Sequence, residues 1–221
     1  MNEVSDFKGH IVFDCDGTII SSIEGIFKGI QVVMSDILGR EVTRDEAFSK
    51  YDADMEKFAN NFGLDISSEK TRSDLLKKWA SVLEGQRNKY DLFDGIKELI
   101  LKLEELGYRL YVWTARDRAS TLSILKSLDV AKHFYDFRCM DDTIPKPHPM
   151  GLDELVGEFD RSKIMMIGDS PTDIRGAKSF GCRSIGALWC SFSNEENLRE
   201  MEADFLAKSP LDCLEIINTN I

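Results

Sequence analysis

Two carboxylates one residue apart follow a short apolar run near the beginning of the chain. Residues 11–13 (Ile-Val-Phe) have the pattern of a buried strand, and Asp14 and Asp16 come directly after it. Unpaired acids at the end of a buried strand are costly, and a divalent cation is the simplest compensation, because two carboxylates and a backbone carbonyl suit Mg²⁺. Gly17 and Thr18 add a tight turn whose exposed amides could bind phosphate. The segment therefore indicates a site for a metal ion and a phosphate group.

Polar side chains also follow other predicted strands later in the chain. Residues 108–113 and 164–167 are apolar, strand-like segments, and residues 134–140 could form another strand. The polar residues that come after these segments are Thr114, Lys146, Asp169 and Asp173. In an open parallel sheet, ligands bind beyond the carboxyl ends of the strands. We therefore expect these side chains to share one site with the two acids of the first strand.

The elements that position these residues alternate between strands and helices. Apolar spacing predicts helices over residues 96–106, after an N-cap at Asp117 and after residue 169. A further strand is predicted over residues 184–188, and the tail from Asn194 is expected to be mostly helical. Alternating strands and helices predict an α/β fold with a parallel sheet and right-handed βαβ connections.

Only helices are predicted between the first strand and the rest of this pattern. Apolar residues recur at helical spacing in four segments of residues 22–85. Thr43 begins the second of them with the pattern of a capping box. We therefore predict two domains, a catalytic core made of residues 1–21 and 86–221 and an all-helical insertion made of residues 22–85.

Composition and charge narrow the class of protein. The formal net charge of −11 argues against nucleic acid and anionic membranes as partners. The five cysteines are scattered and lack Cys-x-x-Cys spacing, which favours reduced thiols in a cytoplasmic protein over disulfides or a zinc site. No apolar run is long enough to cross a bilayer, and the N-terminus lacks a signal-peptide pattern. We expect a cytoplasmic protein, either a monomer or a homodimer.

Four segments resemble, in the same order, the four motifs of the haloacid dehalogenase (HAD) superfamily. They are residues 13–18, Thr114, residues 146–149 and residues 168–173. The helical insertion resembles the α-helical cap of that superfamily's phosphoglycolate phosphatase-like members. The resemblance covers nearly the whole chain and implies a Rossmann-like parallel sheet with an all-helical cap inserted after the first strand.

The same resemblance implies an enzyme, a Mg²⁺-dependent phosphatase that hydrolyses a small phosphomonoester metabolite through an aspartyl-phosphate. It gives Asp14 the role of nucleophile, because a carboxylate can attack phosphorus and carry the phosphoryl group. It gives Asp16 the role of general acid and base, because the ester oxygen must leave protonated and water must later lose a proton.

Further residues acquire implied roles in binding the metal and the phosphate. The implied metal ligands are Asp14, the backbone carbonyl of Asp16, and Asp169, with Asp173 as a candidate supporting residue. The groups implied to stabilise the phosphoryl oxygens are the Thr114 hydroxyl, a backbone amide at Ala115 and the Lys146 ammonium.

Three side chains near these motifs have roles that the sequence leaves open. Ser170 and Asp173 also have the spacing of a helix N-terminal capping box, so Asp173 supports the metal, caps the helix, or does both. Arg116 contacts a substrate anion or pairs with a neighbouring acid. His148 is expected at the surface of its loop rather than in catalysis.

The substrate stays open as well. Ser21 and Ser22 stand where many phosphatases of the superfamily have Asp-Ser. Ala115 and Arg116 stand where asparagine and lysine are common in phosphoglycolate phosphatases, so phosphoglycolate is in doubt as the substrate. Cationic candidates for specificity residues in the insertion are Arg44, Lys50, Lys57 and Arg72.

Two other functions use similar residues. A phosphohexose mutase of the same superfamily would use the same side chains and exclude water. A receiver-type signalling domain also combines acids, a phosphorylated aspartate, a threonine and a lysine on a parallel sheet. Such a domain has no large helical insertion after its first strand and would be roughly half as long as a chain of 221 residues.

Overall fold

The computed structural model describes residues 7–21, 23–51, 55–86 and 90–221. The chain divides into two compact units. The core unit consists of Met1–Ser21 and Asp91–Ile221, and the helical unit consists of Ser22–Tyr90. The insertion therefore runs beyond the predicted end at residue 85, since the last helix continues through Gly85 to Gln86.

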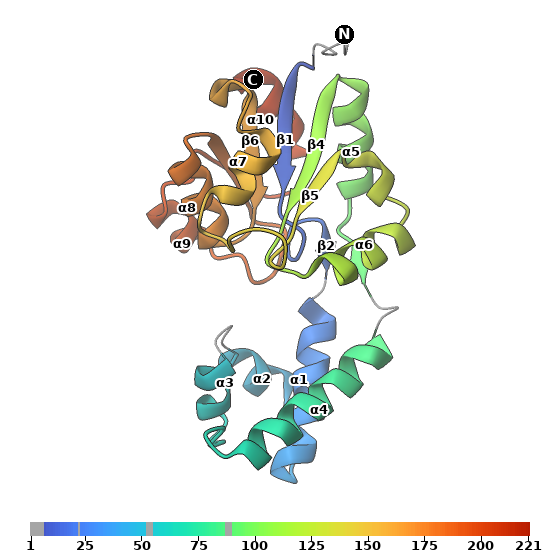
Figure 1. The fold of residues 1–221 in the computed structure, drawn as a ribbon, viewed down its shortest axis with the longest axis vertical. Coiled ribbons are helices and arrows are strands. Elements are labelled where there is room, and N and C mark those ends of the chain that lie inside the picture. The colour runs from blue at the N-terminus through green and yellow to red at the C-terminus, as the bar shows by residue number, and fades with distance from the viewer. Residues whose placement is uncertain (1–6, 22, 52–54, 87–89) are drawn as a thin grey trace. The chain divides into compact units, whose positions relative to one another are not determined.

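The core unit is built on a six-stranded sheet in the order β5-β4-β1-β6-β7-β8, with every neighbouring pair parallel. Its strands are β1 (Gly9–Phe13), β4 (Tyr108–Trp113), β5 (Asp136–Arg138), β6 (Ile164–Gly168), β7 (Arg183–Ala187) and β8 (Phe205–Ala207). The central strands β1 and β6 are buried along their whole length, which fits the apolar runs at residues 11–13 and 164–167. The parallel sheet confirms the predicted Rossmann-like α/β fold (Figure 1).

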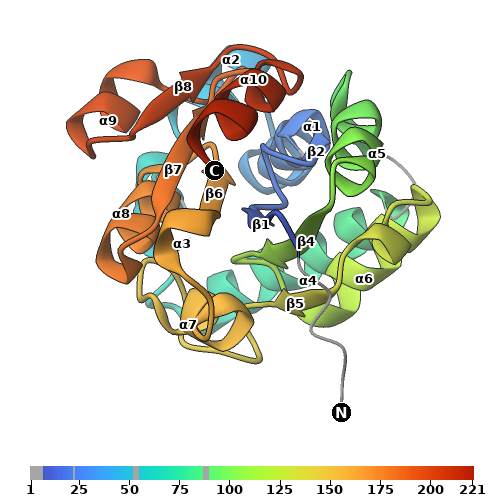
Figure 2. The same ribbon diagram turned by 90° about the horizontal axis from the view of Figure 1, so that it is seen from above.

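Helices cover both faces of this sheet (Figure 2). On one side lie α5 (Ile96–Glu105), α6 (Arg118–Ser127) and α10 (Asp212–Asn220); on the other lie α7 (Met150–Val156), α8 (Pro171–Phe180) and α9 (Glu195–Glu200). Two short 3₁₀ helices, Ala131–His133 and Arg161–Lys163, complete the connections. Helices on both faces bury the sheet and leave its carboxyl edge for polar groups.

Some short elements differ from the sequence prediction. The strand predicted over residues 134–140 is only Asp136–Arg138, because this edge strand pairs with β4 along three residues. The edge strand β8 lies in the tail that was predicted to be mostly helical, and α7 was not predicted. A small antiparallel pair, β2 (Ile20–Ser21) with β3 (Asp91–Leu92), was also missed. The missed strands have only two or three residues, which are too few to show a period.

The helical unit contains four helices in its described residues. They are α1 (Ile23–Leu38), α2 (Arg44–Ser49), α3 (Met55–Asn61) and α4 (Glu69–Gln86). Thr43 caps α2 as predicted, since its hydroxyl accepts a hydrogen bond from the amide of Glu46 at 3.2 Å. The Glu46 carboxylate does not reach back to the cap and instead pairs with Arg40 and Lys50. None of the described helices is long and apolar enough to cross a membrane.

Candidate active site

The carboxyl edge of the central sheet carries the polar residues that the sequence singled out. Asp14 follows β1, Thr114 follows β4 and Asp169 follows β6. Because β1 pairs with both β4 and β6, these three strand ends lie side by side. The side chains of Asp14 and Thr114 are buried, so the edge forms a polar centre inside the core unit.

Lys146 brings two of the acids together. Its Nζ donates to Asp14 Oδ1 at 2.6 Å and to Asp173 Oδ1 at 2.5 Å, and its side chain is only 3% exposed. Burial lowers the pKa of this ammonium, but the two carboxylates outweigh that effect and hold the pKa above its usual value. Lys146 is therefore a buried, charged group rather than a surface lysine.

Trp113 lies beneath this ammonium, with Lys146 Nζ 4.9 Å from the ring centroid. The indole is fully buried. A β-carbon at Gly151 in α7 or at Gly176 in α8 would overlap the ring, so glycine at both positions makes room for it. This contact is not predictable from the sequence, because no local pattern indicates that these three residues meet.

Three carboxylates form a cluster that could hold a metal ion. One ligand oxygen from each of Asp14, Asp169 and Asp173 lies within 4.8 Å of the others. Burial raises the pKa of Asp14 to about 7 even though Lys146 opposes it, and burial also raises the pKa of Asp169 well above its usual value. An all-oxygen set of two buried acids and one half-buried acid that is short of positive charge fits a hard divalent cation.

The turn after β1 presses against this cluster. Gly17 has φ of 83°, a conformation that glycine adopts without a penalty, and its amide donates to the carbonyl of Ile20 at 3.0 Å. A β-carbon at Gly17 would overlap the carboxylate of Asp169. The tight turn indicated by the sequence is therefore present, and it brings the backbone close to a candidate ligand.

Both oxygens of Asp173 are occupied by protein groups. Oδ1 accepts from Lys146, and Oδ2 accepts from the Ser170 amide at 3.1 Å and from the Ser170 hydroxyl at 2.7 Å. Asp173 and Ser170 form a capping box at the start of α8. Of the two roles left open by the sequence, capping is present, and Asp173 also holds the lysine beside Asp14.

Asp16 lies apart from the clustered carboxylates. Arg116 holds it with two hydrogen bonds, from Nε to Oδ2 at 2.8 Å and from Nη2 to Oδ1 at 2.5 Å. Of the two roles that the sequence left open for Arg116, the structure shows the pairing with an acid. The candidate ligand cluster therefore does not include the Asp16 side chain.

The loop after β4 presents the remaining candidates. The Thr114 hydroxyl oxygen accepts a hydrogen bond from the amide of Arg116 at 3.1 Å, which leaves the hydroxyl hydrogen to point to another acceptor. Ala115 is exposed in this loop. His148 is also exposed, and its Nδ1 accepts from the amide of Met150 at 3.3 Å, as expected for a loop-surface residue.

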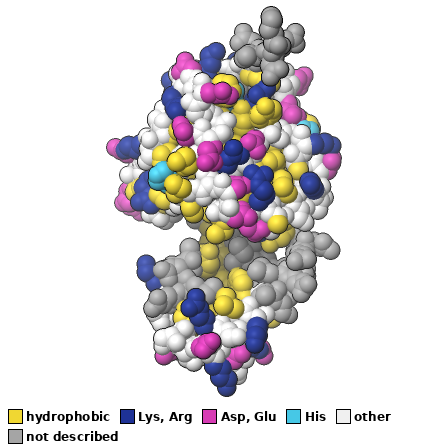
Figure 3. Space-filling view, in the orientation of Figure 1, with side chains coloured by type: hydrophobic (Ala, Val, Ile, Leu, Met, Phe, Trp, Pro, Cys, Tyr) yellow, Lys and Arg dark blue, Asp and Glu magenta, His cyan; other side chains and the backbone are white. Residues whose placement is uncertain are grey.

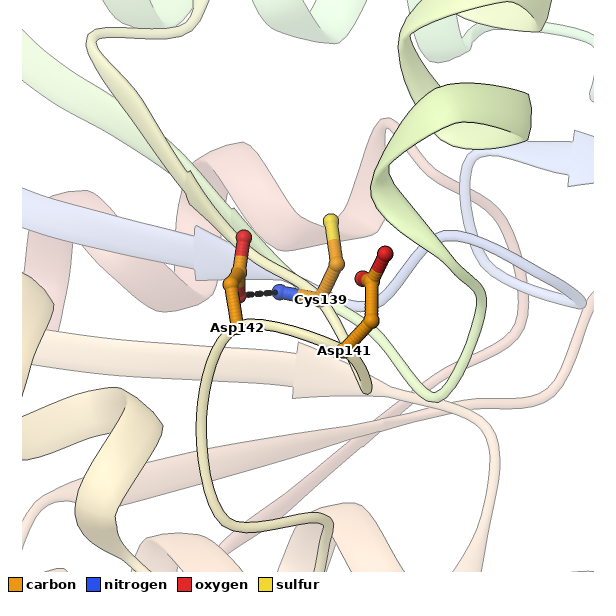
Figure 4. Close-up of side chains that lie close together, drawn as sticks. All are labelled: Cys139, Asp141 and Asp142. Carbon is orange, nitrogen blue, oxygen red and sulfur yellow. Dashed lines mark hydrogen bonds between the residues drawn. The ribbon is translucent and has the colours of Figure 1, made fainter.

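A second group of possible ligands, Cys139, Asp141 and Asp142, lies in the loop after β5 (Figure 4). Its carboxylates already have partners. Asp142 accepts from the amide of Cys139 at 2.6 Å and pairs with the Arg118 side chain, and Asp141 accepts from the amide of Arg118 at 2.9 Å. Burial raises the pKa of the Cys139 thiol to about 11, which disfavours the thiolate. We therefore assign these residues to the structure of the loop.

The charges at the sheet edge do not cancel among the described residues. The carboxylates are Asp14, Asp16, Asp169 and Asp173, and the cations that pair with them are Lys146 and Arg116. Four acids and two cations leave two formal negative charges when every group is ionised. One divalent cation would neutralise them.

A parallel α/β sheet with a buried carboxylate and lysine centre at its carboxyl edge defines the class of open α/β proteins that bind their ligands beyond the ends of the strands. The chain belongs to the haloacid dehalogenase-like hydrolase family, whose model matches residues 11–187. It is therefore a hydrolase, as predicted.

Individual relatives cover almost the whole chain. It is 27% identical to a phosphoglycolate phosphatase from Vibrio parahaemolyticus, over 94% of this chain and 95% of that protein. It is 23% identical to a pyrophosphatase PpaX from Bacillus pumilus, over 95% of this chain and 96% of that protein. The crystal structure of a predicted phosphoglycolate phosphatase from Haemophilus somnus superposes with a TM-score of 0.80 at 20% identity, covering 96% and 99% of the two chains. The family and these relatives support an enzyme of the phosphatase type.

Proposed function

We propose that the protein is a Mg²⁺-dependent phosphatase that hydrolyses a small phosphomonoester through an aspartyl-phosphate on Asp14. The observation that carries this proposal is the Lys146 ammonium, which is buried and shared between Asp14 and Asp173 next to Asp169. A carboxylate in this position is fixed by a cation and lies beside further oxygen ligands. These are the requirements for a nucleophile that must approach an anionic phosphate.

The first step transfers the phosphoryl group to the protein. A carboxylate oxygen of Asp14 forms a bond to phosphorus while the bond from phosphorus to the ester oxygen breaks. Asp16, in its protonated form, gives its proton to the departing oxygen. The Lys146 ammonium, the Thr114 hydroxyl and the amide at Ala115 stabilise the phosphoryl oxygens.

The second step returns the protein to its starting state. A water oxygen forms a bond to phosphorus, and the bond from phosphorus to Asp14 breaks to release inorganic phosphate. The Asp16 carboxylate takes a proton from the attacking water, so this residue serves as acid in one step and base in the next.

The proposed metal site uses the carboxylates of Asp14 and Asp169 and the backbone carbonyl of Asp16, with Asp173 holding Lys146 beside them. Mg²⁺ suits a site made only of oxygen atoms that leaves positions for water and phosphate. When bound, the ion reduces the repulsion between the nucleophile and the phosphate.

The proposed substrate is a small phosphorylated metabolite, and the names of the relatives make phosphoglycolate and inorganic pyrophosphate the first compounds to test. On the face drawn in Figure 3, acidic and basic side chains are interspersed over the described surface of the core unit. Together with the net charge of −11, this favours a small molecule over nucleic acid or a membrane as the partner. We further propose a cytoplasmic monomer or homodimer.

The test separates the roles of the two acids after β1. The purified protein and its Asp14→Asn and Asp16→Asn variants are mixed with Mg²⁺ and 4-nitrophenyl phosphate, quenched rapidly and weighed by intact mass spectrometry. The nitrophenolate group leaves without a proton, so Asp16→Asn should still form the aspartyl-phosphate but fail to hydrolyse it. We expect one added phosphoryl group on Asp16→Asn and none on Asp14→Asn. Glu200→Gln, which removes an exposed acid, serves as the control and should behave as wild type.

Other outcomes would change the proposal. An adduct on Asp14→Asn alone would exchange the roles of the two acids. No adduct on either variant would leave the pair with metal binding only. In a parallel reaction with a sugar phosphate as the substrate, transfer of the phosphoryl group back to the sugar in place of release of free phosphate would identify a mutase. A wild-type aspartyl-phosphate that persists for minutes would identify a receiver-type protein.

A further inference from the structure

The guanidinium of Arg116 occupies both oxygens of the Asp16 carboxylate. Nε and Nη2 each donate to a different oxygen, at 2.8 and 2.5 Å. This two-point contact fixes the plane of the carboxylate as well as its position, which a single hydrogen bond would not do. The Arg116 side chain is 17% exposed and that of Asp16 is 31% exposed, so the pair is partly protected from water.

The backbone of Arg116 is itself fixed. Its amide donates to the Thr114 hydroxyl at 3.1 Å, and its carbonyl accepts from the amide of Met140 at 3.1 Å. The guanidinium is therefore presented from the loop that carries Thr114, and it links that loop to the segment after β1. One residue thus sets the distance between the phosphate-binding loop and the carboxylate of Asp16.

Asp16 needs such a partner because of the charges around it. Asp14 is two residues away in the sequence, and Asp169 belongs to the neighbouring acid cluster. Like charges repel, and a carboxylate without a partner would turn towards water and sample several rotamers. The cation of Arg116 opposes both effects.

We propose that Arg116 is a positioning residue for the second step of the reaction, where it holds the Asp16 carboxylate to receive a proton from the attacking water. Each carboxylate oxygen has two lone pairs, so an oxygen that accepts from Arg116 still has one for the water proton. In that step the proton moves from water to Asp16, the water oxygen bonds to phosphorus and the bond from phosphorus to Asp14 breaks. This inference rests on the proposed role of Asp16.

The experiment compares the formation and loss of the phosphoenzyme in Arg116→Ala and Arg116→Lys with 4-nitrophenyl phosphate and Mg²⁺. Formation should change little, because this leaving group needs no proton. Misplacing a catalytic group by about 1 Å costs roughly a hundredfold, so the decay of the phosphoenzyme in Arg116→Ala should slow by about 10- to 100-fold. Arg116→Lys, with one charge but no planar fork, should fall between Arg116→Ala and wild type.

Chemical rescue distinguishes a positioning role of Arg116 from a merely structural one. Methylguanidinium added to Arg116→Ala should restore part of the decay rate and leave the wild type unchanged. The matched control is Arg138→Ala, which also removes a partly buried arginine, 21% exposed, from its pairs with Asp136 and Glu154. This control should show neither phosphoenzyme accumulation nor rescue.

Normal phosphoenzyme decay in Arg116→Ala would overturn the inference. So would a raised KM with an unchanged kcat, which would identify a substrate contact. If Arg116→Ala does not fold, Arg116→Lys decides, and wild-type decay in that variant contradicts the need for a two-point contact. Accumulation in Asp16→Asn but not in the Arg116 variants refutes only this inference, whereas no accumulation in Asp16→Asn refutes the proposed function itself.

Discussion

Replacing Lys146 with methionine should both destabilise the protein and nearly abolish its activity. The side chains of Lys146, Asp14 and Asp173 are 3%, 9% and 1% exposed, so Lys146→Met leaves two carboxylates buried without their cation. Breaking a buried ion pair by removing one partner costs about 3–5 kcal/mol. For a chain of this size each kcal/mol lowers Tm by about 2–4 °C, which gives a decrease of about 6–20 °C.

This decrease should depend on pH. Burial raises the pKa of Asp14 to about 7, so this carboxyl gains a proton as the pH falls through that value. Because the ammonium lowers this pKa, Asp14 in Lys146→Met keeps its proton to a higher pH than in wild type, so the difference in Tm between the two should be smallest below about pH 6 and increase as the pH rises above about 7. Adding Asp173→Asn to Lys146→Met removes one of the unpaired charges and should recover part of the lost Tm.

The assay is thermal unfolding by circular dichroism in a chelating buffer, together with turnover of 4-nitrophenyl phosphate with Mg²⁺. Turnover should fall by about a hundredfold or more, as when other preorganised electrostatic groups are removed. Lys178→Met is the control, because that lysine pairs with Glu202 at the surface and its side chain is 60% exposed. If Lys146→Met had the same Tm as wild type at every pH and kept its turnover, the buried ion pair would not be the centre of the site.

Three further results are expected. Gly17→Ala should cost about 1–2 kcal/mol of stability, because alanine resists a φ of 83°. It should also lower the Mg²⁺ affinity measured by calorimetry, because its β-carbon would overlap the Asp169 carboxylate, and an unchanged affinity would contradict this prediction. Because burial raises the pKa of Asp14 to about 7 and that of Asp169 well above its usual value, Mg²⁺ must displace protons from these carboxyls at low pH, so its affinity should rise by at least about tenfold per pH unit below about pH 6.5; a flat profile would refute the assignment. Burial lowers the pKa of His10 to about 4, so between pH 6.5 and 4 the unfolded chain takes up a proton that the folded protein does not, and about 3 kcal/mol of the free energy of unfolding is lost over that range. In a His10→Gln variant Tm should therefore depend less steeply on pH between 6.5 and 4, and an equally steep dependence would contradict this prediction.

The sequence predicts the central strands well and the edge of the sheet poorly, for a physical reason. β1 and β6 are buried on both faces and therefore leave continuous apolar runs, whereas β8 is a three-residue strand at the edge of the sheet. Helices with a cap, such as α2 after Thr43 and α6 after Asp117, are also visible, because the cap is a local interaction.

The candidate site also has features that the sequence predicts and features that it does not. That Asp14, Thr114 and Asp169 come after neighbouring strands can be expected from the sequence, because strand ends of a parallel sheet meet at one edge. The pairing of Arg116 with Asp16 joins residues 100 positions apart, and the burial of Lys146 depends on the path of a loop. No local pattern encodes either of them.

The fit of Trp113 between Gly151 and Gly176 limits the order in which these positions can change. Alanine at either glycine would collide with the indole while tryptophan is present, and overpacking a core costs about 1–3 kcal/mol. Once a smaller residue replaces the tryptophan, the same alanine would fill the space that the indole left. Replacing the tryptophan first avoids this collision, but that step removes the aromatic face from Lys146. A set of substitutions that conserves the core volume thus alters the surroundings of Lys146 at the candidate site.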